Sequence, residues 1–300
     1  MITNESSPLS EPLVDSLSGF PGHSSNRQPV VINPDDPPWG VLKALLTWIM
    51  SIGCLVFVPL LVVVPYIIYL ATTSGIPQAE NLATDKTIQF LSILGVVPAH
   101  LLTFAVGWVV VTNWGRYPFW QTLGFTWPAS FGPWKSTGLA VVLLAVGGGI
   151  TALYGGSKTQ LDQLIESSYQ ARLVTAFLAA ATGPFVEELV YRGVLYPAVQ
   201  RVMGVGIAIA IVSIMFAGVH VIQYYNNIAV IGVILLLSIT LTVVRARTGR
   251  LLPSFMIHLV FNSIQSIFLV VQPFFEKADM VLPNKTPACQ IIINTILHFI

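Results

Sequence analysis

The sequence predicts an all-α membrane protein, a polytopic helical bundle of seven to eight transmembrane helices. Two observations support this fold class. Hydrophobic residues make up 54% of the 300 residues and charged residues only 9%, and the mean hydropathy is +0.77. A soluble domain carries about 25% charged residues. In addition, the apolar residues gather in stretches of about 20, the length that an α-helix needs to cross a bilayer.

Residues 1–40 differ in kind from the rest of the chain. They are rich in Ser, Pro, Asn and Gly and contain no long apolar stretch. A secretory signal would show a basic segment followed by an apolar one, and neither is present here. We therefore expect a disordered tail over residues 1–40 that ends near Trp39, followed by the helical bundle over residues 41–300.

Seven stretches of the chain are apolar and long enough to span a bilayer. In chain order they are residues 41–71, 87–112, 137–154, 172–200, 205–224, 227–244 and 253–271. An eighth stretch, CQIIINTILHFI at residues 289–300, is short for a span and is expected to be tilted, interfacial or packed against the bundle. The aromatic residues with Pro and Gly between the second and third spans predict an interfacial elbow.

Basic residues are biased towards one side of these spans. If the N-terminus is inside, most Arg and Lys residues fall in inner loops, whereas the outer loops mix Lys with Asp and Glu. The positive-inside rule then predicts an integral, multi-pass membrane protein with a cytoplasmic N-terminus. The net charge of +1 argues against nucleic acid as a partner. The two cysteines, Cys54 and Cys289, are interpreted as buried or unpaired thiols.

Few ionisable side chains fall inside the predicted spans. Each charged one costs about 2.5 to 3.5 kcal/mol on insertion scales, so each raises a functional hypothesis. The polar residues of interest are Glu187, Glu188 and Arg192 in the fourth span, His220 in the fifth, and His258 with Asn262 in the seventh. His100 in the second span has no carboxylate beside it in the sequence and is interpreted as packing.

Helical geometry separates the two adjacent glutamates. Glu188 and Arg192 are four residues apart and share one face of a helix, so they can form an ion pair. Glu187 is turned about 100° away from Glu188, which leaves its carboxylate free for another task. Gly183 and Pro184 precede this pair. Because proline removes a backbone donor and tends to kink or begin a helix, it would open room for water beside Glu187.

The set of one free carboxylate, two imidazoles and one amide permits the activation of water. The free carboxylate would act as a general base, while a histidine opposite it would hold the water and pass a proton. A second imidazole and an amide would donate hydrogen bonds to the carbonyl oxygen that gains charge. His258 and Asn262, also four residues apart, present an imidazole and an amide together. Such a set would hydrolyse an amide without a covalent intermediate. Taken singly, each group also has a structural explanation, because a transmembrane histidine usually bonds to a neighbouring helix.

The same side chains also allow a metal site. Carboxylate and imidazole are common zinc ligands, and Glu187, His220 and His258 would hold the ion if zinc were bound. The sequence contains no HExxH motif, so a metal site would have to be assembled across helices. We favour a metal-free reaction that needs no cofactor.

Three short motifs resemble those of a known family. EELVYRG, FAGVH and HLVFN occur in this order on the fourth, fifth and seventh spans. They resemble the EExxxR, FxxxH and HxxxN (or HxxxB) motifs of the CPBP family of CAAX proteases and bacteriocin-processing membrane proteins. The resemblance covers residues 171–271, which we take as the catalytic core. It implies a bundle of about eight spans and a hydrolase that resembles the type II CAAX prenyl endopeptidase.

The resemblance also implies a role for each motif. The first and second motifs would supply Glu187 and His220, which act on the water. The third would supply the oxyanion-stabilising pair, His258 and Asn262, while Glu188 and its arginine would support the site. The expected partners are a membrane-associated or lipidated peptide as substrate and the lipid bilayer.

Two other classes of function stay open at this stage. An ion-coupled or proton-coupled transporter would use the same glutamates and histidines as a relay, with polar groups continuing towards both faces of the membrane. A non-catalytic scaffold or immunity protein would bind a partner through its loops or its tail. In the scaffold, replacing Glu187 by Gln would leave function intact.

Overall fold

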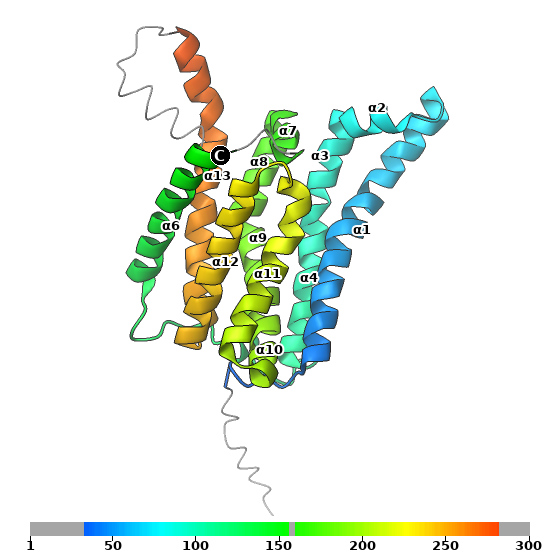
Figure 1. Ribbon diagram of the computed structural model, residues 1–300. Coiled ribbons are helices and arrows are strands. Elements are labelled where there is room, and N and C mark those ends of the chain that lie inside the picture. Colours follow the sequence, from blue (N-terminus) through cyan, green and yellow to red (C-terminus); the bar gives the residue numbers. More distant parts are fainter. Residues whose placement is uncertain (1–32, 156–159, 282–300) are drawn as a thin grey trace, which may run out of the picture. The chain divides into compact units, whose positions relative to one another are not determined.

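The computed structural model describes residues 33–155 and 160–281, and every regular element in these residues is a helix. The predicted all-α class is therefore confirmed. Seven helices in this part of the chain are long and apolar enough to cross a membrane (Figure 1). They comprise Val41–Ser74, Lys86–Thr112, Pro133–Tyr154, Tyr169–Met203, Val205–Tyr224, Ile228–Thr248 and Leu251–Phe274. Each contains or overlaps one predicted span, whereas the eighth predicted stretch, residues 289–300, lies outside the described residues.

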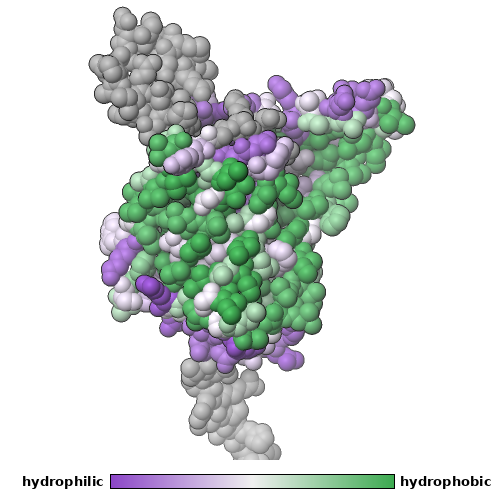
Figure 2. All heavy atoms as spheres, viewed as in Figure 1, coloured by the Kyte–Doolittle hydropathy of each residue, from purple (hydrophilic) through white to green (hydrophobic). Residues whose placement is uncertain are grey.

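The surface of the helices is apolar along their middle and polar towards their ends on the face shown in Figure 2. Helix α1, Val41–Ser74, has large apolar side chains on its outer face, such as Leu42, Phe57 and Leu61, which are all more than half exposed. An apolar surface of this extent is unfavourable in water and suits the hydrocarbon of a bilayer. The chain is accordingly an integral, multi-pass membrane protein. Which end faces the cytoplasm stays a prediction.

The second span is interrupted where α1 crosses it. After the short α2, Ala79–Thr84, the span consists of α3, Lys86–Leu94, and α4, Val96–Thr112. Gly95 separates these two helices, and a Cβ added there would lie only 2.6 Å from the Cα of Pro59 in α1. Glycine is needed at this position because the two backbones approach so closely.

The predicted elbow between the second and third spans is a compact turn. Helix α4 ends at Thr112, and the next three residues, Asn113, Trp114 and Gly115, all adopt positive φ angles. The chain then forms the single turn α5, Phe119–Thr122, before α6 begins at the first-turn proline of Pro133–Tyr154. Because proline lacks the N–H that a first-turn residue would leave unpaired, this start is favourable.

The fourth span is the most enclosed and the least regular. Of its most apolar window 44% is buried, against 6% for α1. Its helical path contains two π-helical segments, in which hydrogen bonds reach back over five residues. Helix α7, Gln160–Glu166, precedes the span. The span itself consists of α8 Tyr169–Phe177, η1 Leu178–Thr182, α9 Gly183–Glu188, η2 Leu189–Leu195 and α10 Tyr196–Met203.

The last three spans complete the bundle around the fourth. They are α11 Val205–Tyr224, α12 Ile228–Thr248 and α13 Leu251–Val281. Gly204 and Gly249 form the connections at one end with φ of 82° and 62°, a left-handed backbone that favours glycine. Helix α11 packs on α12, and α13 packs on both α12 and α6. Figure 1 shows α9 between α4 and α13, so the glutamates lie inside the bundle.

Residues 33–40, which we call the N-terminal strap, lie against the end of the bundle where α1 begins. Asp35 forms a 2.6 Å ion pair with Arg245 of α12, whose side chain is buried. Trp39 is also buried, and its indole N–H donates to the carbonyl oxygen of Val194 in η2 at 2.9 Å. Of the tail predicted over residues 1–40, the strap is the part that the structure describes. It connects α1 to the end of the fourth span.

Candidate active site

The two adjacent glutamates lie in a short α-helical stretch between two π-helical segments. Helix α9, with the sequence GPFVEE, follows η1 and precedes η2. In η1 the hydrogen bonds span five residues, as from the N–H of Gly183 to the carbonyl oxygen of Leu178. Such segments add one residue to a helical turn and often occur at functional sites. They change the direction in which the glutamate side chains leave the helix.

Asn262 compensates for the missing backbone donor of Pro184. In the five-residue register of η1, the next N–H would come from residue 184 and would bond to the carbonyl oxygen of Ala179, but proline has none. The side-chain amide of Asn262 on α13 donates to this oxygen at 3.1 Å. This contact uses one of the two amide hydrogens of Asn262. The second hydrogen is the one that the predicted oxyanion role requires.

Glu188 and Arg192 form the predicted ion pair. The Nη1 of Arg192 lies 2.9 Å from Oε1 of Glu188, and both side chains are almost completely buried. Arg192 also donates to Thr242 Oγ1 at 3.2 Å and to the hydroxyl of Ser238 at 2.6 Å, and both residues lie on α12. Its guanidinium stacks over the ring of Phe216 at 4.6 Å. Glu188 is thereby committed to a fixed and neutralised pair.

His258 lies between the two glutamates. Its Nδ1 is 3.2 Å from Oε1 of Glu188, and because that oxygen belongs to a paired carboxylate, Nδ1 is the donor. Its Nε2 is 3.6 Å from Oε2 of Glu187, slightly too far for a direct hydrogen bond. To donate to an oxyanion through Nε2, His258 must therefore carry both ring protons. The buried imidazole is thus oriented by Glu188 towards Glu187.

Glu187 is the carboxylate that remains accessible. Its side chain is 29% exposed, whereas that of Glu188 is 1% exposed. Its Oε1 lies 4.0 Å from the point where a Cβ would stand on Gly183, so the side chain folds back over that glycine. Among the described residues, no arginine or lysine pairs with Glu187, and His258 is its ionic neighbour. A partly exposed carboxylate at this depth in a span suits a group that acts on water.

His220 is near the other groups but does not touch Glu187. Its Nδ1 donates to the backbone oxygen of Phe216 at 2.8 Å, which leaves Nε2 with a free lone pair. The ring of Phe216 lies between the two histidines, with centroid distances of 4.9 Å to His220 and 5.9 Å to His258. In the part of the chain that the structure describes, no hydrogen bond or ion pair joins His220 to Glu187. A water between them is therefore an additional requirement of the predicted role.

His100 contributes a contact that the sequence did not indicate. This residue of α4 is buried, and its Nδ1 lies 2.8 Å from the hydroxyl of Thr182 at the end of η1. The interpretation of His100 as packing rested on the absence of a carboxylate near it in the sequence. A signal was present, because an imidazole within an apolar span needs a polar partner from another helix. The partner itself depends on how the helices pack.

Aromatic rings enclose the site on the side of the elbow. Phe185, two residues before Glu187, lies 5.8 Å from Phe104 of α4 and 5.8 Å from Phe255 of α13 by ring centroids. Trp120 and Phe125 of the elbow pack against the same ring at 6.0 and 6.5 Å. The elbow therefore packs against the helix that carries the glutamates.

The residues expected for a zinc site do not form one in this arrangement. Among the described residues, no group of three or more His, Cys, Asp or Glu is placed to hold a metal ion. Nδ1 of His220 is occupied by a backbone oxygen, and Nδ1 of His258 by Glu188. Glu187, His220 and His258 would have to rearrange to bind zinc.

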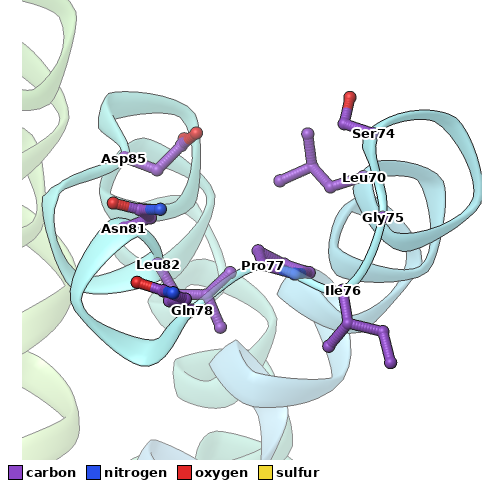
Figure 3. Close-up of a pocket in the computed structure, with 9 residues that line it drawn as sticks. All are labelled: Leu70, Ser74, Gly75, Ile76, Pro77, Gln78, Asn81, Leu82 and Asp85. Carbon is purple, nitrogen blue, oxygen red and sulfur yellow. The ribbon is translucent and has the colours of Figure 1, made fainter.

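A pocket of about 450 Å³ lies elsewhere, where α1 ends and α2 begins (Figure 3). None of the predicted site residues lines it. The carboxylate of Asp85, at its edge, accepts from the N–H groups of Thr87 and Ile88 and so caps α3. The lining residues are Leu70, Ser74, Gly75, Ile76, Pro77, Gln78, Asn81, Leu82 and Asp85. The pocket is separate from the glutamate site.

Comparison with known proteins identifies the same region of the chain. Residues 169–264 match the family described as type II CAAX prenyl endopeptidase Rce1-like. The match includes all three motifs and confirms the resemblance to CAAX-type intramembrane proteases. Neither a curated protein nor a solved structure matches the chain.

Proposed function

We propose that the chain is an intramembrane endopeptidase that uses activated water. The match of residues 169–264 to the type II CAAX prenyl endopeptidase Rce1-like family supports this proposal. The observation that carries this proposal is the unequal state of the two glutamates. Glu188 is buried and paired with Arg192, whereas Glu187 is partly exposed and faces an oriented imidazole. Of the two glutamates, Glu187 is therefore the one that we expect to exchange protons with water.

The reaction would begin with a proton transfer from water to the carboxylate of Glu187. The resulting hydroxide attacks the carbonyl carbon of the peptide bond, and the carbonyl oxygen becomes an anion. The doubly protonated ring of His258 and the second amide hydrogen of Asn262 would stabilise this oxygen. Glu187 then returns its proton to the leaving nitrogen as the C–N bond breaks, which yields a carboxylic acid and an amine.

His220 would hold the water on the side opposite Glu187. Because Nδ1 of His220 is fixed on the oxygen of Phe216, its Nε2 can accept a hydrogen bond from the water. A water held by two acceptors presents its oxygen lone pair to the substrate. His220 would then help to orient the nucleophile without contacting Glu187 directly.

The substrate we propose is a peptide held at the membrane, either by its own apolar segment or by a covalent lipid. The site lies within a bundle whose surface is suited to lipid, so a peptide anchored in the same bilayer reaches it by lateral diffusion. Anchoring also raises the local concentration of the peptide at the site.

The test is cleavage of membrane-associated peptides, with and without a C-terminal prenylated cysteine, by the purified protein. We expect Glu187→Gln to lower kcat by about 10²- to 10⁴-fold, the usual contribution of a general base. Glu187 is not paired with Arg or Lys, so the variant should keep the unfolding temperature of the wild type. Glu80→Gln, at an exposed position of α2, serves as the matched control and should be fully active.

Four results would argue against this proposal. If Glu187→Gln still cleaves the peptide, Glu187 is not the general base. If a chelator abolishes cleavage by the wild type, the reaction requires a metal. If the wild type cleaves no peptide while proton or ion flux across vesicles depends on Glu187, the proton-coupled alternative replaces the peptidase. If neither activity is found and Glu187→Gln is neutral, a scaffold is favoured.

A further inference from the structure

We propose that His100 is a positioning residue for Glu187, so that the second span is a working part of the site. This inference rests on the proposed function. His100 belongs to α4, outside residues 169–264, which match the family. It is buried, and its Nδ1 is 2.8 Å from the hydroxyl of Thr182. A contact of this length is a full hydrogen bond.

Thr182 is placed where it controls the course of the backbone beneath Glu187. It is the last residue of η1, and Gly183 follows it directly. The carboxylate of Glu187 lies over Gly183, with Oε1 4.0 Å from the position of an added Cβ. Any shift of the backbone at Thr182 and Gly183 would therefore move the surface against which the Glu187 carboxylate rests.

Segment η1 is held from two sides by side chains of other helices. Asn262 on α13 donates to the oxygen of Ala179, and His100 on α4 bonds to Thr182. The two contacted residues, Ala179 and Thr182, lie three positions apart in η1, just before Pro184. Together they hold a backbone that has lost one of its own hydrogen bonds.

A neighbouring residue shows that a polar group on α4 need not have such a partner. Thr103, one turn after His100, is 1% exposed, and its hydroxyl has no hydrogen-bond partner among the described residues. Both residues are polar, buried and carried by the same helix, but only His100 reaches η1. Thr103→Val is therefore a matched control that changes a buried polar group without touching the site.

The experiment compares kcat and KM for His100→Leu, Thr182→Val, the double variant and Thr103→Val in the peptide cleavage assay. We expect each of the first two variants to lower kcat by about 10- to 100-fold, the effect of a small misplacement of a catalytic group, while KM changes less than twofold. The double variant should lose no more than the larger single loss, because both changes break one contact. Thr103→Val should match the wild type.

A conservative variant separates positioning from simple packing. Asn can place a polar atom near the position of Nδ1, so His100→Asn should recover most of the kcat that His100→Leu loses. Additive losses in the double variant, or a wild-type kcat in Thr182→Val, would overturn the proposal. Equal inactivity of His100→Asn and His100→Leu would also overturn it, because the ring would then act through another atom.

A readout that does not need activity keeps this inference separate from the proposed function. Amide hydrogen exchange over residues 178–188 should be at least about 10-fold faster in His100→Leu and Thr182→Val than in the wild type, with no change in Thr103→Val. If the wild type cleaves no peptide, faster exchange still supports the positioning contact, and only the peptidase proposal fails. Unchanged exchange would refute the positioning role, whatever the activity.

Discussion

At the scale of single residues, Arg192 explains how a charge pair is tolerated in the fourth span. The side chain is fully buried, and all of its nitrogens have partners: Glu188 within the same helical path, and Ser238 and Thr242 on α12. A buried ion pair is tolerated when its charges are paired and hydrogen-bonded. Arg192 meets this condition at every nitrogen, whereas Oε2 of Glu188 has no hydrogen-bond partner among the described residues. Arg192 therefore fixes Glu188, and Glu188 in turn orients His258.

Replacing Arg192 should lower the stability of the folded protein. We expect Arg192→Met to lower the free energy of unfolding by about 3–5 kcal/mol, because it leaves the buried carboxylate of Glu188 without its arginine counter-ion and with His258 as its remaining partner. Denaturant unfolding in detergent, followed by helical circular dichroism, measures this change. Arg247→Met, at an exposed position of α12, is the control and should stay within about 0.5 kcal/mol. An equal effect in both variants would contradict the special role of Arg192.

The sequence could predict the partners of Glu188 only in part. The spacing of four residues predicted its pairing with Arg192, because that contact depends on helical periodicity alone. The contacts of Arg192 with Ser238 and Thr242 lie 46 and 50 residues away along the chain, and only tertiary packing creates them. The partner of His100, 82 residues away, is hidden for the same reason.

At the scale of elements, the fourth span lacks one backbone hydrogen bond, and a side chain of another helix replaces it. Pro184 removes a backbone donor, and Asn262 on α13 supplies a substitute to Ala179. The predicted kink at Gly183 and Pro184 takes the form of a continuous path with two π-helical segments. Periodicity of apolar residues could not reveal these segments, because a π-helical turn inserts one residue without changing the composition of a span.

The defect and its repair should be coupled in a double-mutant cycle. We expect Asn262→Leu to lower the free energy of unfolding by about 1–3 kcal/mol, because the oxygen of Ala179 is left without a donor. Pro184→Ala restores a backbone N–H, so the double variant Pro184→Ala/Asn262→Leu should regain about half of that loss or more. Pro197→Ala, near the start of α10, is the control proline and should give no such rescue. Strict additivity of the two changes would contradict the link between them.

At the scale of the whole molecule, the N-terminal strap joins elements that are far apart in the sequence. Asp35 reaches Arg245 of α12, and Trp39 reaches Val194 of the fourth span. Composition alone predicts a disordered tail up to residue 40, because its proline and polar residues form no helical pattern. The long-range contacts of the strap are specific side-chain interactions that composition cannot reveal. The seven spans among the described residues, by contrast, were predictable from the lengths of the apolar stretches.

Releasing the strap should weaken the bundle at this end. We expect Asp35→Ala to lower the free energy of unfolding by more than 1 kcal/mol, because it leaves the buried guanidinium of Arg245 without its counter-ion. Asp36→Ala breaks the exposed pair with Arg201 and should change it by about 0–1 kcal/mol. Thermal unfolding in detergent and the rate of proteolysis near Trp39 measure both variants. If Asp36→Ala is the more harmful, the strap is not held by its buried pair.

The contacts of helix α12 affect how sequence variants of this chain are interpreted. It carries none of the three motifs, yet Ser238 and Thr242 hold Arg192 and, through it, the glutamate that aims His258. Under the proposed function, an inherited change at either hydroxyl would impair cleavage while leaving every proposed reacting group in the gene product intact. A search for damaging alleles that reads only the motifs would pass over both positions. The positions at which a change would harm the proposed function therefore extend to a helix that supplies none of the proposed reacting groups.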